Sequence, residues 1–304
     1  MIGLGAISDT DGVDPHLLRS FVAVARRRSF SAAARELGFT QSAVSQQVAA
    51  LEADLGAVLL NRRPVTPTRA GARLLDHAVP LLLRLDAARA DVARLAAPPS
   101  ARVVVGASPL AVTALGPALA DVRREHPDLV VTVRVLGRSA LIREVATAAV
   151  DVGLADGAVA PSDSLPLPDA GPLRAVGVLE RPLAVLLPPR HPLAGRAGLR
   201  LADLAAAGWI DAPDTAVPLG RLRTAAGAEG YRASVRYEGT DVGGLVALVG
   251  AGHGLAVLPD PTGAALSGVT AVPVTEPRLV HRVEAVHSPT LAGVPAALAA
   301  ALTG

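Results

Sequence analysis

The chain has 304 residues, 51% of them hydrophobic and 18% charged, which is enough for about two folded domains and too apolar for a disordered chain. It has no cysteine, and all 29 basic residues are arginine, which excludes disulfides, thiol catalysis, cysteine-type zinc sites and Schiff-base or P-loop lysines. The formal net charge of +2 is unevenly spread, with +5 over residues 14–75 and −1 over residues 98–304. This basic excess favours a nucleic-acid partner for the early part.

Residues 1–13 carry two acidic side chains and no basic run, so we expect a flexible tail and no signal peptide. The long uncharged stretch 242–259 is interrupted by five glycines, which predicts a helix, a turn and a strand instead of a membrane span. We therefore expect a cytoplasmic protein with no membrane contact.

Three helices are predicted next, from Pro15 to the basic run at 26–28, over 31–37 and over 41–55. Asp14 is the expected cap of the first, Ser29 or Ser31 of the second, and Thr40 of the third. The buried stripe of the third helix is predicted to hold these residues: Val44, Val48, Leu51 and Leu55.

The opposite face of the third helix is short-chained and uncharged, with Ser42, Gln46, Ala49 and Ala53 at its centre and Ser45 on its flank. Two helices joined by a glycine turn, the second presenting glutamine and serine, are typical of a helix-turn-helix, although an ordinary solvated helix would show the same pattern. The basic excess favours DNA.

Residues 61–68 hold two prolines among β-favouring residues, which predicts a small hairpin or wing. Arg62 and Arg63 at its edge are candidates for phosphate contacts.

Residues 69–95 are predicted to form one long helix, kinked or divided at Pro80. Apolar residues recur at heptad spacing along it, which predicts a dimerising seam. The predicted seam consists of Leu74, Ala78, Leu81, Leu85, Ala88, Val92 and Leu95.

After a linker over 96–101, strands and helices alternate, which indicates an α/β half with two lobes. Strands are expected over 102–107, 129–136, 151–155, 183–187, 208–211, 234–238, 254–258 and 279–286. Helices are expected over 109–125, 138–149, 240–249 and 295–302.

Ligands of open α/β sheets bind beyond the carboxyl ends of strands, near helix N-termini. Ser108, Ser139 and Thr240 stand at such junctions, where each could cap a helix or contact a ligand. Arg138 is the fixed cation at these turns and could bind an anion, or form a surface ion pair.

The run SFSAAARELGFTQSAVSQQVAALEADLG, within 17–71, resembles the LysR-type transcriptional regulators. RHPLAGR (190–196), LADLAAAGWI (201–210) and LVALVGAGHGLAVLP (245–259) are similar to the effector domain of that family.

The resemblance implies a bacterial regulator of transcription with three parts: a winged helix-turn-helix over 14–71, a dimerising linker helix over 69–97, and an effector domain over 101–304 that resembles periplasmic binding proteins. The first lobe is expected over about 101–165 and 268–304, the second over about 166–267. The implied partners are operator DNA, RNA polymerase, a small-molecule effector between the lobes and further copies of the chain in a dimer or tetramer. No cofactor, metal or catalytic residue is expected.

The resemblance also implies roles for individual residues. Those near DNA are Ser29, Ser31, Thr40, Gln41, Ser42, Ser45, Gln46, Arg62 and Arg63. Those near the effector are Ser108, Arg138, Ser139, Asp156, Thr215 and Thr240. Family members often have proline at 42 and a basic residue at 46, where this chain has serine and glutamine, so the base preference of the family does not carry over to it; glutamine favours adenine geometry and arginine favours guanine.

The alternative is a solute-binding or enzymatic α/β protein with no DNA role. The glycine-rich run at 250–254 lacks the third glycine of a dinucleotide loop and precedes a strand. The seven histidines are scattered, without metal-ligand spacing. We therefore expect no enzyme.

Overall fold

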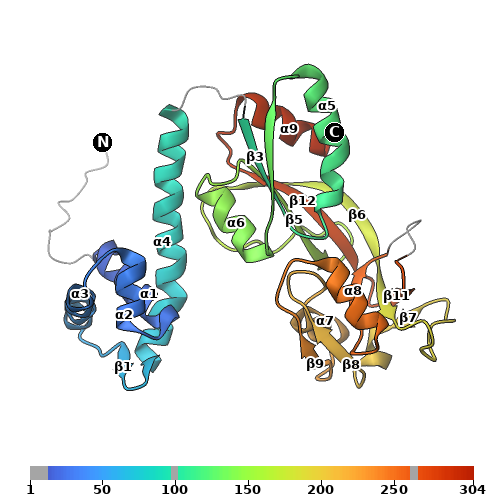
Figure 1. The fold of residues 1–304 in the computed structure, drawn as a ribbon, viewed down its shortest axis with the longest axis horizontal. Coiled ribbons are helices and arrows are strands. Elements are labelled where there is room, and N and C mark those ends of the chain that lie inside the picture. The colour runs from blue at the N-terminus through green and yellow to red at the C-terminus, as the bar shows by residue number, and fades with distance from the viewer. Residues whose placement is uncertain (1–12, 97–101, 261–265) are drawn as a thin grey trace, which may run out of the picture. The chain divides into compact units, whose positions relative to one another are not determined.

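The computed structural model describes residues 13–96, 102–260 and 266–304 (Figure 1). The chain divides into two compact units, Met1–Asp86 and Ala87–Gly304. The expected tail over 1–13, apart from Val13, and the linker residues 97–101 lie outside the described residues. No helix in the described ranges is long and apolar enough to cross a membrane.

The first unit holds three helices, a two-stranded antiparallel hairpin and the start of a long helix. In chain order they are α1 (Pro15–Arg27), α2 (Phe30–Leu37), α3 (Gln41–Asp54), β1 (Leu60–Arg62), β2 (Val65–Pro67) and α4 (Arg69–Ala96). Asp14, Ser29 and Thr40 cap α1, α2 and α3 by accepting hydrogen bonds from backbone N–H groups. Because Ser29 and not Ser31 is the cap, α2 begins at Phe30, one residue earlier than expected.

The core of the first unit is closed by the start of α4. Ala78 is fully buried in this core and Leu74 packs against it. These two members of the expected seam are therefore part of their own domain, which corrects the heptad reading there. Leu81, Leu85, Val92 and Leu95 keep between 41% and 73% of their surface exposed. Pro80 lies inside a helix that continues through it.

The second unit contains an eight-stranded mixed sheet and a separate parallel pair of strands. Its strands are β3 (Arg102–Ala107), β4 (Val130–Val135), β5 (Val152–Val159), β6 (Arg174–Leu187), β7 (Leu199–Arg200), β8 (Gly208–Asp211), β9 (Arg232–Arg236), β10 (Ala256–Pro259), β11 (Thr270–Glu276) and β12 (Val280–His287). Its helices are α5 (Leu115–Glu125), α6 (Arg138–Ala146), α7 (Leu219–Ala226), α8 (Val242–Gly250) and α9 (Gly293–Thr303), with short 3₁₀ turns at Val112–Ala114 and Leu201–Leu204. α7, β7 and β11 were not predicted, and α5 begins six residues later than expected.

The long strand β6 joins the lobes of this unit. β12 pairs with β5 on one side and with Arg174–Pro182 of β6 on the other, while Leu183–Leu187 of β6 pairs with β10 and β11. The first half of β6 therefore belongs to the sheet of the first lobe, and β11 belongs to the second. Both assignments differ from the lobe limits expected from the sequence, which placed residues 166–267 in the second lobe and residues 268–304 in the first.

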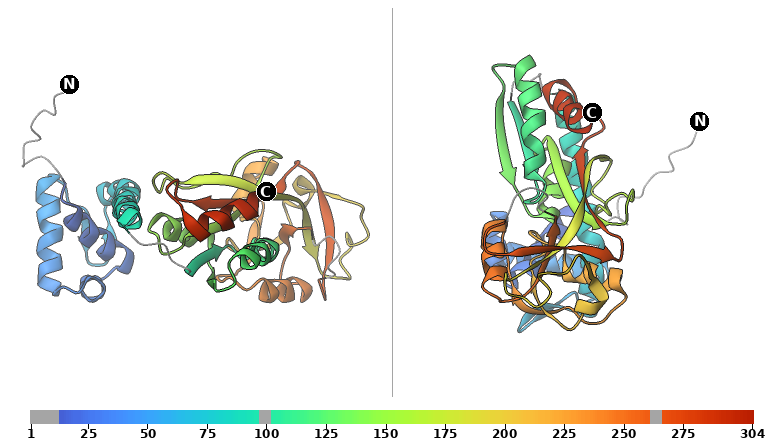
Figure 2. Two further views of the ribbon diagram at one scale, coloured as in Figure 1. Left: turned by 90° about the horizontal axis from the view of Figure 1, so that it is seen from above. Right: turned by 90° about the vertical axis from the view of Figure 1, so that its right-hand side faces the viewer.

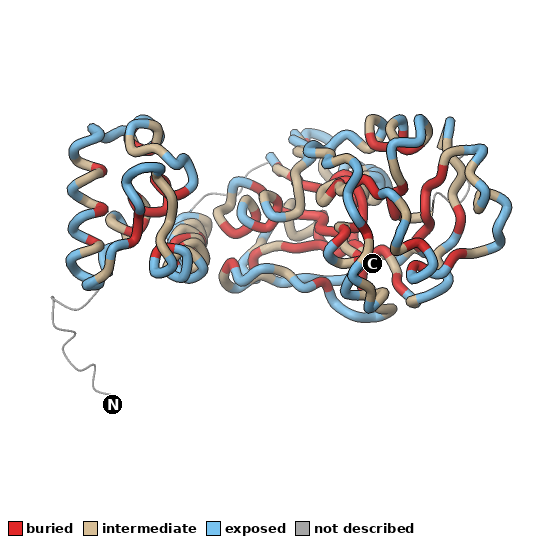
Figure 3. Tube along the Cα trace, turned by 90° about the horizontal axis from the view of Figure 1, so that it is seen from below, coloured by how far each residue is buried: buried red, intermediate tan, exposed pale blue. Residues whose placement is uncertain are grey.

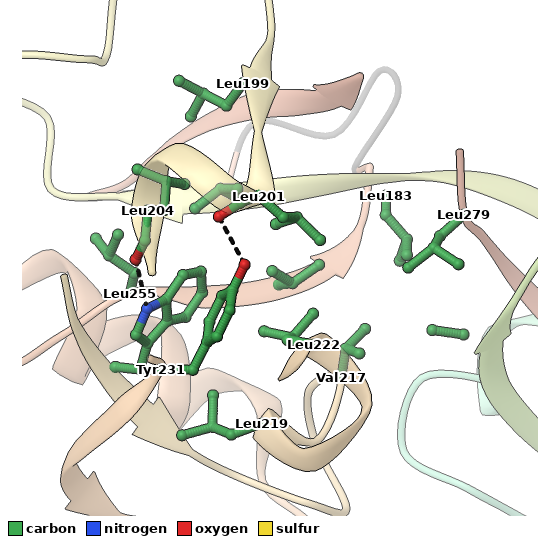
Figure 4. Packing of buried hydrophobic residues seen from close by; sticks show 14 of the residues in the cluster. Leu183, Leu199, Leu201, Leu204, Val217, Leu219, Leu222, Tyr231, Leu255 and Leu279 are labelled. Atoms are coloured by element: carbon green, nitrogen blue, oxygen red, sulfur yellow. Dashed lines mark hydrogen bonds between the residues drawn. The ribbon is translucent and has the colours of Figure 1, made fainter. Parts of the chain in front are cut away.

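Each lobe has its own apolar core. In the first lobe α5 and α9 lie side by side on the sheet (Figures 1 and 2). Buried backbone follows the inner strands, and exposed backbone follows the outer turns and helix faces (Figure 3). In the second lobe the Trp209 indole donates to the Leu204 carbonyl and the Tyr231 hydroxyl to the Leu201 carbonyl, so both rings are buried with their polar atoms satisfied (Figure 4).

Candidate functional site

The recognition face of α3 is the first candidate site. Val44, Val48 and Leu51 are fully buried against the core of the first unit, and the opposite face, centred on Ser42 and Gln46, is exposed. Leu55 was expected in the buried stripe, but 39% of it is exposed because it caps the helix C-terminus, where the chain turns away. The exposed face is therefore one of small and polar side chains.

Most polar side chains at the start of α3 are already hydrogen-bonded to one another. The Ser31 hydroxyl donates to the Gln41 side-chain oxygen at 2.8 Å, and the Thr40 and Ser42 hydroxyls lie 3.1 Å apart. In contrast, the side chains of Ser45 and Gln46 make no hydrogen bond to any described residue. Of the expected DNA-reading residues, these two keep their full hydrogen-bonding capacity for another molecule.

A further polar residue of α3 has a structural role that the sequence did not indicate. Gln47 accepts a hydrogen bond from Ser20 at 2.6 Å, and Ser20 is 1% exposed on α1. This bond fixes α3 on α1, and with it the orientation of the exposed face.

The hairpin places Arg62 and Arg63 differently. Arg62 pairs with Glu52 at 3.0 Å and its guanidinium lies 4.9 Å from the centre of the Phe30 ring. Arg63 is exposed and has no ion pair or hydrogen bond in the described chain. Arg63 is therefore the freer of the two expected phosphate ligands.

The second candidate site lies in the second unit, around the N-terminus of α6. Residues Gly106 and Gly153, on β3 and β5, leave room for α6, because a side-chain carbon at either position would collide with Leu141 or Val145. This close approach of helix and sheet brings Arg138, the first residue of α6, next to Asp156 on β5.

Arg138, Asp156 and His281 form a buried network. Arg138 binds both carboxylate oxygens of Asp156, at 2.9 and 3.1 Å, and the His281 Nε2 lies 2.8 Å from the same carboxylate. Burial alone would raise the pKa of Asp156, but the hydrogen bond from His281 and the charge and hydrogen bonds of Arg138 outweigh it and hold that pKa well below its ordinary value. His281 was not among the expected site residues.

The same arginine ties the two lobes together. Its guanidinium also donates to the carbonyls of Pro213 and Ala216 in the second lobe. In return, the carboxylate of Asp214 accepts from the backbone N–H of Arg138 at 3.0 Å and lies where a side chain at Gly137 would stand. An acidic group at a helix N-terminus is electrostatically favourable, so Asp214 acts as a cap supplied from the other lobe. Arg138 was expected either to bind an anion or to form a surface ion pair; it instead forms an ion pair with a buried carboxylate and donates to two carbonyls of the second lobe.

The other expected effector residues are dispersed. Ser108 is fully buried and donates to the Leu154 carbonyl. Thr215 is fully buried, with a hydroxyl that has no partner. Thr240 is exposed and does not cap α8; Asp241 does, accepting from two backbone N–H groups. None of these three lines the cavity beside Arg138, because α8 starts later than expected and the two buried hydroxyls face the protein interior.

A cavity of about 260 Å³ lies next to the network. Its wall is largely apolar, from α6, β5, the segment 165–168 and the start of α7. Three of the residues expected near the effector line it, Arg138, Ser139 and Asp156, together with Arg221 of the unpredicted helix α7. No group of three or more histidine or acidic residues in the described ranges is placed to hold a metal ion.

Two family models match the chain. One, described as the bacterial regulatory helix-turn-helix protein of the lysR family, covers residues 15–72, and the other, the LysR substrate binding domain, covers residues 96–301.

Individual proteins are similar over parts of the chain. A probable hydrogen peroxide-inducible genes activator of Mycobacterium avium is 37% identical over 182 residues, 59% of this chain and 56% of that protein. The uncharacterized HTH-type transcriptional regulator YnfL of Escherichia coli K12 is 32% identical over 62% of each chain. The chain thus matches less than two thirds of the length of either relative.

A solved structure of full-length CbnR complexed with its target DNA has a TM-score of 0.52 at 20% identity, covering 96% of this chain and 99% of that one. At this identity the likeness shows a shared fold.

Proposed function

Because the chain belongs to the lysR family of bacterial regulatory helix-turn-helix proteins, we propose that it binds operator DNA in a sequence-dependent way and that a small molecule bound in its second unit changes that binding. The observation that carries the proposal is the exposed face of α3, where Ser45 and Gln46 stand without partners on a helix fixed from behind by Gln47. Glutamine and serine hydrogen-bond base edges in the major groove.

In this proposal the remaining polar residues position the helix on the DNA backbone. Ser31, Thr40, Gln41 and Ser42 lie at the N-terminus of α3 and Ser29 at the N-terminus of α2, and backbone N–H groups at helix N-termini favour a phosphate. Arg63 adds a phosphate contact from the hairpin, and Arg62 does so when it exchanges Glu52 for phosphate.

The proposed assembly is a dimer or a higher oligomer formed through α4. Its seam is shorter than the heptad pattern indicated, and runs through Leu81, Leu85, Ala88, Val92 and Leu95, which are exposed. Apolar residues at heptad positions associate because pairing removes them from water. RNA polymerase is the further proposed partner of the DNA-bound form.

The name of the Mycobacterium avium relative describes a response to hydrogen peroxide. Peroxide oxidises cysteine thiolates and methionine thioethers, and this sequence has no cysteine and a single methionine, Met1. We propose that the signal of this chain is instead a ligand held without covalent chemistry in the second unit.

The test is to mix the full chain with sheared DNA from its own genome, recover bound fragments at physiological salt and sequence them. Sharp peaks sharing an inverted repeat are the expected result. Gln46→Ala should lose the peaks while retaining non-specific binding, and the remote exposed variant Arg236→Gln should retain both. Uniform recovery without peaks by folded protein would contradict sequence-specific binding.

A further inference from the structure

The cavity beside α6 carries one uncompensated positive charge. Three ionisable side chains line it: Arg138, Asp156 and Arg221. Arg138 and Asp156 form a bidentate pair, so their charges cancel. Among the described residues that line the cavity Asp156 is also the sole acidic one, which leaves Arg221 without a counter-ion among them.

Arg221 is held in place and still able to bind. Its Nε donates to the Ala158 carbonyl at 2.9 Å, and its two terminal nitrogens make no hydrogen bond to any described residue. The anchored Nε reduces the side-chain freedom that a ligand would otherwise have to remove, and the free edge of the guanidinium matches a carboxylate.

The rest of the wall favours an apolar ligand of small size. Ile142, Leu165, Pro166, Leu167 and Pro218 supply carbon surface, and Ser139 supplies a hydroxyl that has no described partner. The volume of about 260 Å³ lies slightly below the usual range of ligand pockets, about 300–1,000 Å³.

We propose that this cavity binds a small apolar monocarboxylate, whose carboxylate is held by Arg221 and Ser139 and whose hydrocarbon part lies against the proline and leucine wall. The proposal rests on the effector role proposed above and names the ligand class of that site. A second carboxylate would be buried beside Asp156 or against apolar carbon with no cation to pair it, so dicarboxylates are disfavoured. A neutral amide forgoes the charge-assisted hydrogen bonds to Arg221.

The experiment is calorimetric titration of the full-length protein with hexanoate, cyclohexanecarboxylate and phenylacetate. The matching amides and the dicarboxylates succinate and adipate serve as comparison ligands. The variants are Arg221→Gln, Ser139→Ala and the control Arg236→Gln, whose arginine is exposed and paired with Glu238 away from the cavity lining. Emission of Trp209, the single tryptophan, verifies that each variant is folded.

The expected result is one monocarboxylate bound per chain, with an affinity at least about tenfold lower in Arg221→Gln and in the amide series, and unchanged in Arg236→Gln. Ser139→Ala should show a smaller loss. The ligand class is overturned if none of the monocarboxylates binds, if a dicarboxylate or an amide binds more tightly, or if folded Arg221→Gln retains wild-type affinity.

The failure of this inference can be distinguished from failure of the proposed function. Operator recovery by ligand-free protein tests DNA recognition and does not depend on Arg221. Peaks without carboxylate binding would refute the ligand class alone, and carboxylate binding without peaks would refute the DNA role alone.

Discussion

Breaking the pair between Arg138 and Asp156 should destabilise the second unit by amounts that differ between the two partners. The Asp156 side chain is fully buried, while 20% of the Arg138 side chain is exposed. Removing one member of a buried pair costs about 3–5 kcal/mol because the other charge stays uncompensated. Solvent reaches Arg138 in part, so Asp156→Asn should fall below that range, at about 2 kcal/mol.

Arg138→Met should cost more. The substitution leaves the fully buried carboxylate of Asp156 with His281 as its remaining partner, and it removes the hydrogen bonds to the carbonyls of Pro213 and Ala216. We expect a cost of about 4 kcal/mol. The double variant Arg138→Met/Asp156→Asn leaves no unpaired charge, so it should cost about 3 kcal/mol, well below the sum of the single variants.

Urea unfolding of the full chain, followed by Trp209 emission, measures these differences because the single tryptophan lies in the core of the second lobe. With a urea dependence of about 2–3 kcal/mol per molar, the midpoint should fall by about 1.5 M for Arg138→Met and by about 0.8 M for Asp156→Asn. Arg236→Gln, which breaks an exposed ion pair, is the matched control and should shift it little. Single variants no worse than this control, or strictly additive effects, would refute the reasoning.

Three further outcomes are expected. The pKa of Asp156 is lowered on folding, so the stabilisation by its carboxylate is complete above the ordinary pKa of 3.8 and is lost as the pH falls through the lower pKa of the folded state. Acid titration followed by Trp209 emission should therefore show the stability of Asp156→Asn approaching that of wild type below the folded-state pKa. Asp214→Ala should cost about 1 kcal/mol and speed hydrogen exchange of the first-turn amides of α6; unchanged exchange would exclude the capping role. Arg63→Ala should lower the salt slope of DNA binding by about one and Arg62→Ala by less; equal losses would show that the pair with Glu52 is no constraint.

The first unit could be predicted from the sequence almost residue by residue because its signals are local. Caps at Asp14 and Thr40, a glycine turn and a periodic apolar stripe each act within a few residues. The exceptions depend on contacts between distant segments. Ala78 fits a heptad seam, but the core formed by α1 and α3 covers it. Only the folded chain shows which of two apolar surfaces covers such a residue.

The second site could be predicted only in part, because most of its contacts join residues that are far apart along the chain. Arg138 and Asp156 were both among the residues expected near the effector, and the structure places them in contact, Arg138 at the start of α6 and Asp156 on β5. Their mutual pairing, the approach of Asp214 from the other lobe and the addition of His281 depend on residues far away along the chain. Arg221 was missed because its helix, α7, was not predicted: the helix is short and no capping side chain in the sequence marks its start.

The hydrogen bonds of Arg138 connect the proposed effector role of the second unit with the proposed carboxylate ligand. A ligand carboxylate that bound Arg138 would have to displace Asp156, its partner in the same lobe, or the second-lobe carbonyls, and loss of the carbonyls would remove bonds between the lobes. A carboxylate that binds Arg221 leaves those bonds intact and adds a contact between Ser139 of the first lobe and α7 of the second. Ligand binding would then strengthen the joined state already present and shift its population, since a ligand stabilises the state to which it binds more tightly. Such a ligand should raise the urea midpoint of wild-type protein. The rise should be smaller in Asp214→Ala, because fewer bonds hold the lobes together in that variant. An equal rise in both proteins would show that ligand binding does not depend on the contacts between the lobes.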